Sequence, residues 1–134
     1  MDGTAASEAG EMAQAMYAAF TIHRAVGGAD ATTAETVLYW ATAGGARALG
    51  LEGTGTLEVG KAADLLLLDL NHPRYFGQHD PAIGPIISGG ELSVRFSFVA
   101  GREIVVNGQL PWLDLRALRA DAARIVARLQ SGAT

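Results

Sequence analysis

The sequence predicts an α+β fold, with helical segments first, strands in the middle and one more helix at the end. Three observations lead to this prediction. Residues 11–26 repeat apolar side chains at helical spacing, residues 63–70 are mostly apolar, and residues 92–99 alternate between apolar and polar side chains. Gly- and Pro-rich stretches separate these segments, and no internal repeat or flexible linker divides the chain.

The first segment, residues 11–26, is predicted to be an amphipathic helix. Met12, Met16 and Phe20 recur every four residues, so they share one face of the helix. The pair Gly27-Gly28 follows, and glycine is the usual residue just after a helix C-terminus.

A second helix is expected to follow at once. Thr32 stands three residues before Glu35, which is the spacing of a capping box at a helix N-terminus. The pair Gly44-Gly45 is expected to interrupt this helix, and a short helical turn after it should end at Gly50.

The central segments are predicted to be strands. The run 63–70 is too short for a typical helix between Gly-rich flanks and is expected to form a strand buried on both faces. A long Pro- and Gly-rich loop over 71–90, with a helical turn near 83–87, should lead to the alternating strand 92–99. Turns at 100–102 and at Asn107-Gly108 predict a hairpin. Asp114 is expected to cap a final helix.

Composition excludes several classes of function. The chain has no cysteine, so disulfides, thiolate metal sites and cysteine nucleophiles are excluded, and a reducing cytoplasm is the expected location. A net charge of −4 with no basic patch argues against nucleic acid as a partner. No apolar run approaches the length of a membrane helix, and the N-terminus has neither the charge nor the hydropathy of a signal peptide.

Few residues are candidates for chemistry. The three histidines fit no local metal-binding spacing, and structural roles are the expectation for His23 and His72. His79 adjoins Asp80 inside the long loop, where ligand contacts often lie. Asp2 precedes a run of small residues and then the first helix. It is either an ordinary solvated acid or the acid at the end of a (β/α)₈-barrel strand, where catalytic groups lie.

Five stretches resemble known sequences. Residues 42–50 (TAGGARALG) and 55–69 (GTLEVGKAADLLLLD) are similar to the amidohydrolase-superfamily signature ATxxGAxxLG…GxLxxGKxADLxxxD. Residues 99–108 resemble the later VxGxxVxxxG hairpin of that superfamily, and residues 2–8 (DGTAASE) resemble its DGxASN segment. The 79–81 loop is most similar to the branch of 8-oxoguanine deaminase and hydroxychloroatrazine hydrolase, within the cyclic deaminases that include guanine and cytosine deaminase.

The resemblance implies a division of the chain. Residues 1–50 would hold the end of barrel strand 8 and the last barrel helices of a metal-dependent hydrolase. Residues 51–113 would form the C-terminal part of a composite β-sandwich, and 114–134 a terminal helix. Asp2 would then be the catalytic base and a metal ligand, and His79 a substrate contact. Lys61 and Asp64 would be structural residues at the entry to a strand, with Asp64 accepting hydrogen bonds from the preceding turn.

The resemblance also implies the function and the partners. Relatives use zinc or iron to hydrolyse carbon–nitrogen bonds of cyclic amidines such as purine, pyrimidine or triazine rings. This chain lacks a His-x-His pair and is too short for a barrel, so we expect no tightly bound metal and no activity from the chain alone. Homo-oligomers are expected through sheet edges and through an exposed barrel-facing surface at Met12, Met16 and Phe20. The alternative is a free-standing non-catalytic interaction module.

Overall fold

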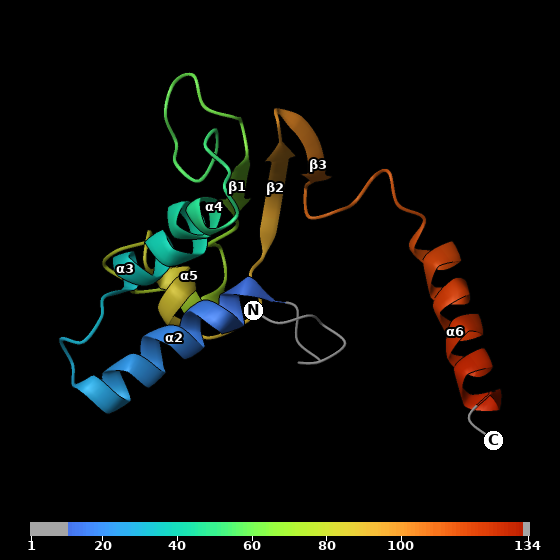
Figure 1. The fold of residues 1–134 in the computed structure, drawn as a ribbon, viewed down its shortest axis with the longest axis horizontal. Coiled ribbons are helices and arrows are strands. Elements are labelled where there is room, and N and C mark those ends of the chain that lie inside the picture. The colour runs from blue at the N-terminus through green and yellow to red at the C-terminus, as the bar shows by residue number, and fades with distance from the viewer. Residues whose placement is uncertain (1–10, 133–134) are drawn as a thin grey trace.

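The computed structural model of the chain describes residues 11–132 and consists of a helical body, a three-stranded sheet and a C-terminal helix that stands apart (Figure 1). This mixed helix-and-sheet architecture confirms the predicted class. The elements are α2 (Met12–Gly27), α3 (Ala34–Tyr39), the π-helix η1 (Trp40–Gly44), α4 (Gly45–Ala48), β1 (Leu65–Leu68), the 3₁₀-helix η2 (Pro73–Tyr75), α5 (Gly84–Ile87), β2 (Val94–Val99), β3 (Arg102–Val106) and α6 (Leu115–Ser131).

The first helix ends where the sequence predicts. Gly28 follows α2 with φ 90°, a backbone conformation that glycine adopts without steric cost, and its N–H donates to the carbonyl of Arg24 at 3.0 Å. Arg24 also holds the next loop in place. Its guanidinium lies 4.9 Å from the centre of the Phe20 ring and donates a 3.2 Å hydrogen bond to the carbonyl of Thr32.

The predicted cap of the second helix is wrong by one residue. Thr33, not Thr32, caps α3, and its hydroxyl accepts a 3.2 Å hydrogen bond from the N–H of Thr36. The physical reason is burial: only 5% of Thr32 is exposed, so its side chain is taken into the interior and the helix starts one residue later. Glu35 consequently lies at the second helical position and does not complete a capping box.

The expected interruption at Gly44-Gly45 is also wrong. The backbone stays helical through α3, η1 and α4, and both glycines have ordinary right-handed helical angles. A side chain at Gly44 would place its Cβ 3.2 Å from the carbonyl oxygen of Tyr39, so the wide π-helical turn leaves little room there for anything larger. The predicted end at Gly50 is confirmed, with φ 70°.

The core lies between α2, α3 and α5. Its buried members are Met16, Ala34, Val37 and Ile86, and the half-buried residues packed around them are Ala19, Phe20, Ala41 and Ile83. The expectation of an exposed face at Met12, Met16 and Phe20 is therefore wrong for the last two. Helices α3 and α5 of the same chain cover that face, and only Met12 is largely exposed.

The sheet has the order β1-β2-β3, and both of its pairings are antiparallel. Leu67 lies opposite Phe96, which in turn lies opposite Val106. The strand β1 confirms the predicted run, but its burial on both faces is wrong: Leu66 is 54% exposed and Leu67 46%. Nothing among residues 11–132 packs over these leucines closely enough to bury them, although β1 is the strand nearest to the helical body (Figure 1).

The predicted turns of the hairpin are confirmed. Ala100 and Gly101 join β2 to β3 with φ 49° and 76°, the two left-handed residues of a tight hairpin turn. Asn107 and Gly108 form a second such turn, with φ 50° and 75°, and Val106 and Gln109 exchange hydrogen bonds across it.

The remaining elements agree with the sequence in position. The loop 71–90 contains η2 and the expected helical turn α5. The Asp114 carboxylate caps α6 by accepting hydrogen bonds from the N–H groups of Arg116 and Ala117, at 2.9 and 3.0 Å. Among the described residues, no helix is both long and apolar enough to cross a bilayer.

Candidate functional site

Of the two predicted site residues, the structure describes one. Asp2 lies outside residues 11–132, so its predicted catalytic and metal-binding roles stay predictions. His79 is exposed in the loop between η2 and α5. Its neighbour Asp80 does not pair with it but folds back locally, with its carboxylate accepting a 2.9 Å hydrogen bond from the N–H of Ala82. His79 is thus accessible to a ligand, and its substrate contact stays a prediction.

The other two histidines make structural contacts. His23 donates from Nδ1 to the carbonyl of Ala19 at 2.8 Å, one turn earlier in α2, and its ring lies 5.3 Å from that of Trp40. His72 caps η2, because its Nδ1 accepts a 3.3 Å hydrogen bond from the N–H of Arg74. These contacts agree with the structural roles expected for both residues.

The described residues do not fit a catalytic metal. A catalytic zinc takes three protein ligands. Across residues 11–132, no three His, Asp or Glu side chains lie close enough together to hold an ion. The metal chemistry of a complete enzyme would therefore need ligands from outside this part of the chain.

The signature stretch around Asp64 is a structural clamp. One carboxylate oxygen accepts a 2.7 Å hydrogen bond from the N–H of Ala100, and the other accepts a 2.7 Å hydrogen bond from the hydroxyl of Thr54. The Ala100 amide and the Thr54 hydroxyl lower the pKa of the Asp64 carboxyl below its ordinary value of 3.8. The predicted bond to the preceding turn is confirmed, whereas the bond to Ala100 could not be foreseen, because it spans 36 residues.

The same clamp explains the neighbouring residues of the stretch. Lys61 donates from Nζ to the carbonyl of Glu52 at 3.3 Å, which ties the two ends of the loop 51–62 together. The N–H of Gly101 donates to the carbonyl of Ala63 at 3.0 Å, beside the bond from Ala100 to Asp64. The stretch therefore fastens the loop, the start of β1 and the β2–β3 turn to one another, in agreement with the structural role expected for Lys61 and Asp64.

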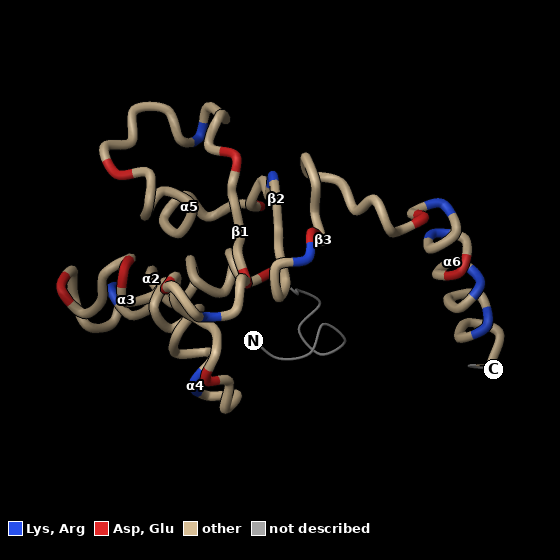
Figure 2. Tube along the Cα trace, turned by 90° about the horizontal axis from the view of Figure 1, so that it is seen from above, with Lys and Arg blue, Asp and Glu red and all other residues tan. Residues whose placement is uncertain are grey.

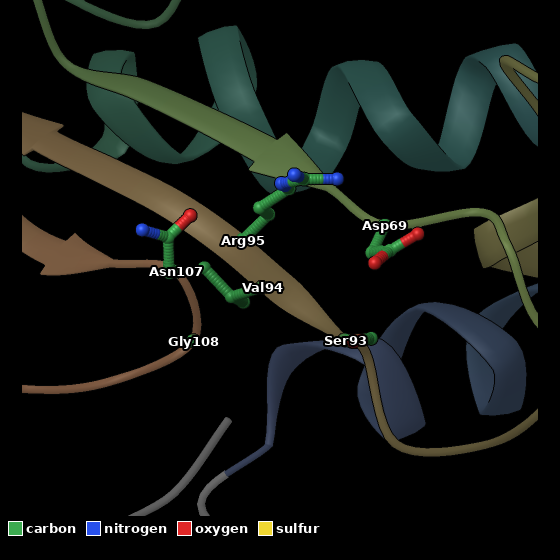
Figure 3. Close-up of a pocket in the computed structure, with 6 residues that line it drawn as sticks. All are labelled: Asp69, Ser93, Val94, Arg95, Asn107 and Gly108. Atoms are coloured by element: carbon green, nitrogen blue, oxygen red, sulfur yellow. The ribbon is translucent and has the colours of Figure 1, made fainter.

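An open pocket of about 280 Å³ lies at the other end of the sheet (Figure 3). It is lined by Asp69, Ser93, Val94, Arg95, Asn107 and Gly108. These residues come from three separate stretches, so no sequence motif could have revealed the pocket. Arg95 and Asp69 form no ion pair there, and the Asp69 carboxylate accepts a 2.9 Å hydrogen bond from the N–H of Asn71. The pocket brings together polar groups but neither His79 nor another histidine.

The comparisons with known proteins agree with the resemblance. The family model described as "Amidohydrolase family" matches residues 1–108. An isoxanthopterin deaminase from an unknown prokaryotic organism is 40% identical over 96% of this chain, and an 8-oxoguanine deaminase from Pseudomonas aeruginosa is 37% identical over 95%. The match takes up 30% and 29% of those two proteins, so the chain spans less than a third of their length.

Solved structures give the same result. An amidohydrolase from an environmental sample of the Sargasso Sea is 41% identical, with a TM-score of 0.85 over 99% of this chain and 31% of its own. An adenosine deaminase from Xanthomonas campestris with bound zinc is 34% identical, with a TM-score of 0.91 over 97% of this chain and 30% of its own. The family match covers most of the chain, and both the sequences and the folds agree, so this chain belongs to the amidohydrolase family.

Proposed function

We propose that this chain is the C-terminal portion of a metal-dependent amidohydrolase that deaminates a heterocycle, by hydrolysing a ring amidine carbon–nitrogen bond. The observation that carries the proposal is the match over almost the whole chain to two deaminases, named for isoxanthopterin and 8-oxoguanine. The substrate would be a related ring. A fused purine- or pterin-like heterocycle is a better candidate than a pyrimidine or a triazine.

The three parts of the chain would have separate tasks in the complete enzyme. Residues 1–50 would supply the end of the eighth barrel strand and the last barrel helices, 51–113 part of the composite β-sandwich, and 114–134 the terminal helix. The positions of α2–α4, of the sheet and of α6 support these boundaries. The Asp64 clamp would stiffen the sandwich portion, since it joins three of its segments.

Asp2 would be the chemical contribution of this chain. As a metal ligand and general base it would accept a proton during the hydrolysis, and His79 would contact the substrate ring; the metal, when bound, would supply activation of the attacking water. The metal would be zinc or iron, held mainly by residues outside this chain. The Xanthomonas campestris relative with bound zinc supports zinc as the first choice.

Homo-oligomers in the cytoplasm are part of the proposal. Within the described sheet β1 is an edge strand, and this position and its exposed leucines support self-association through the sheet. The alternative of a non-catalytic module has no observation in its favour, because the relatives named above are enzymes.

A joined polypeptide tests the proposal. The part of the isoxanthopterin deaminase that precedes the matched segment would be fused to residue 1 of this chain, and zinc content and ammonia release from isoxanthopterin and 8-oxoguanine would be measured. We expect one equivalent or more of zinc and turnover. The matched variant Asp2→Asn should lower turnover by about 10²–10⁴-fold, as expected for loss of a general base. A folded fusion that binds no zinc and releases no ammonia would contradict the proposal.

A further inference from the structure

The helix α6 has an apolar stripe that the described residues leave uncovered. Its members are between 46% and 69% exposed, and they are Leu115, Leu118, Ile125, Val126 and Leu129. At about 100° per residue they occupy an arc of about 100°, which is the width of a face that normally packs against a core. Acidic and basic residues also recur along α6 (Figure 2), and helical spacing places them outside this arc, where Arg124 and Asp121 form an ion pair at 2.9 Å.

The position of α6 is defined even though the helix lies apart from the rest of the chain (Figure 1). The segment that leads to it is attached to β3, because Trp112 donates from its indole nitrogen to the carbonyl of Ile104 at 2.9 Å. The Xanthomonas campestris adenosine deaminase matches this arrangement over 97% of the chain with a TM-score of 0.91. The unmatched 3% of 134 residues is about 4 residues, whereas α6 has 17, so most of α6 lies within the match.

Something in that relative must hold the helix there. An isolated helix of this length gains little from its own hydrogen bonds, and its stability in a protein comes mainly from packing its apolar face. The relative is a longer chain, of which the matched segment is only 30%. The additional chain is therefore a source, within the same polypeptide, of a surface that could pack against the stripe.

We propose that the apolar stripe of α6 docks on the part of the enzyme that precedes this chain, and that this contact attaches the C-terminal portion to the remainder. The inference rests on the proposed function, because it requires a longer amidohydrolase. A second copy of this chain is the competing occupant, and the experiment is designed to separate the two.

The absence of cysteine from the chain permits a direct test. Leu118→Cys places one thiol in the stripe, and Ala120→Cys places a matched thiol on the opposite side of α6, where the side chain is also exposed. Each variant is made in the 134-residue chain and in the fusion to the preceding part of the isoxanthopterin deaminase. The rate of alkylation is read on the α6 peptide by mass spectrometry, so cysteines elsewhere in the fusion do not interfere.

We expect both thiols to react at similar rates in the 134-residue chain. In the fusion, the thiol of Leu118→Cys should be alkylated more slowly by a factor of about ten or more, while that of Ala120→Cys should keep its rate. Two results would overturn the proposal: equal rates in a folded fusion, and protection of Leu118→Cys in the 134-residue chain that rises with its concentration.

Ammonia release from the same fusion keeps the two proposals apart. Protection of Leu118→Cys without ammonia release counts against the proposed function alone. Ammonia release without protection counts against the docking of α6 alone.

Discussion

Ile86 is expected to contribute more to the stability of the described fold than any residue beside it. It is 1% exposed and packs in the cluster with Met16 and Val37, so its side chain attaches α5 to α2 and α3. Truncation of a buried isoleucine to alanine costs about 2–5 kcal/mol, because the transfer free energy is lost and a cavity remains. With a dependence of about 2 kcal/mol per molar urea, Ile86→Ala should lower the unfolding midpoint by roughly 1–2.5 M.

The neighbouring residue provides a matched control. Ile87 has the same side chain but is 37% exposed, so Ile87→Ala leaves no closed cavity and should cost about 1 kcal/mol. Both variants would be followed in urea by circular dichroism at 222 nm and by tryptophan fluorescence. Equal midpoint shifts for the two variants would refute the assignment of the core to the α2–α3–α5 contact.

Three further predictions concern the glycines and the clamp. The pKa of the Asp64 carboxyl is lowered in the fold, so the ionised carboxylate stabilises the fold above pH 3.8, the ordinary pKa. This stabilisation is lost as the pH falls through the pKa of the folded state. The melting temperatures of wild type and Asp64→Asn, compared from pH 7 to 2, should therefore converge below pH 3.8. Gly55→Ala should destabilise the fold more than Gly60→Ala in chemical denaturation, because both have φ near 90° but only at Gly55 would the new Cβ come within 2.9 Å of other atoms. Ala100→Gly should stabilise the fold by about 1 kcal/mol, since φ 49° strains an alanine and not a glycine, and an unchanged melting temperature would speak against such strain.

Local patterns in the sequence predicted the local structure well. The spacing of Met12 and Met16, the glycines after α2 and the Asn107-Gly108 pair each act through neighbouring backbone and side chains, and each is confirmed. The errors at Thr32 and at Gly44 have a different origin. At Thr32 a tertiary contact decides the outcome, because the residue is buried in the interior, and such burial cannot be read from spacing. At Gly44 the helix itself widens into a π-turn, in which the glycine lies against the carbonyl of Tyr39 five residues earlier.

The candidate site could be predicted only in part, for a related reason. His79 is visible in the sequence as a histidine in a Pro- and Gly-rich loop, and the loop does leave it exposed. The polar pocket at Asp69 and Arg95 joins distant stretches through strand pairing, so no local pattern indicates it. The same holds for the bond from Ala100 to Asp64, since only the hairpin brings residues 36 positions apart into contact.

The leucines of β1 are more exposed in the described fold than their sequence predicts, and the proposed longer enzyme accounts for the difference. A run of four leucines in a strand is typical of burial on both faces, yet Leu66 and Leu67 are about half exposed in the described fold. The stripe of α6 shows the same mismatch on a separate element. Two unrelated elements thus carry sequences suited to more burial than residues 11–132 supply. Additional chain packed against the sheet and against α6 would bury both sets of apolar side chains. The longer relatives contain additional chain of this kind, since the match covers only 30% of each.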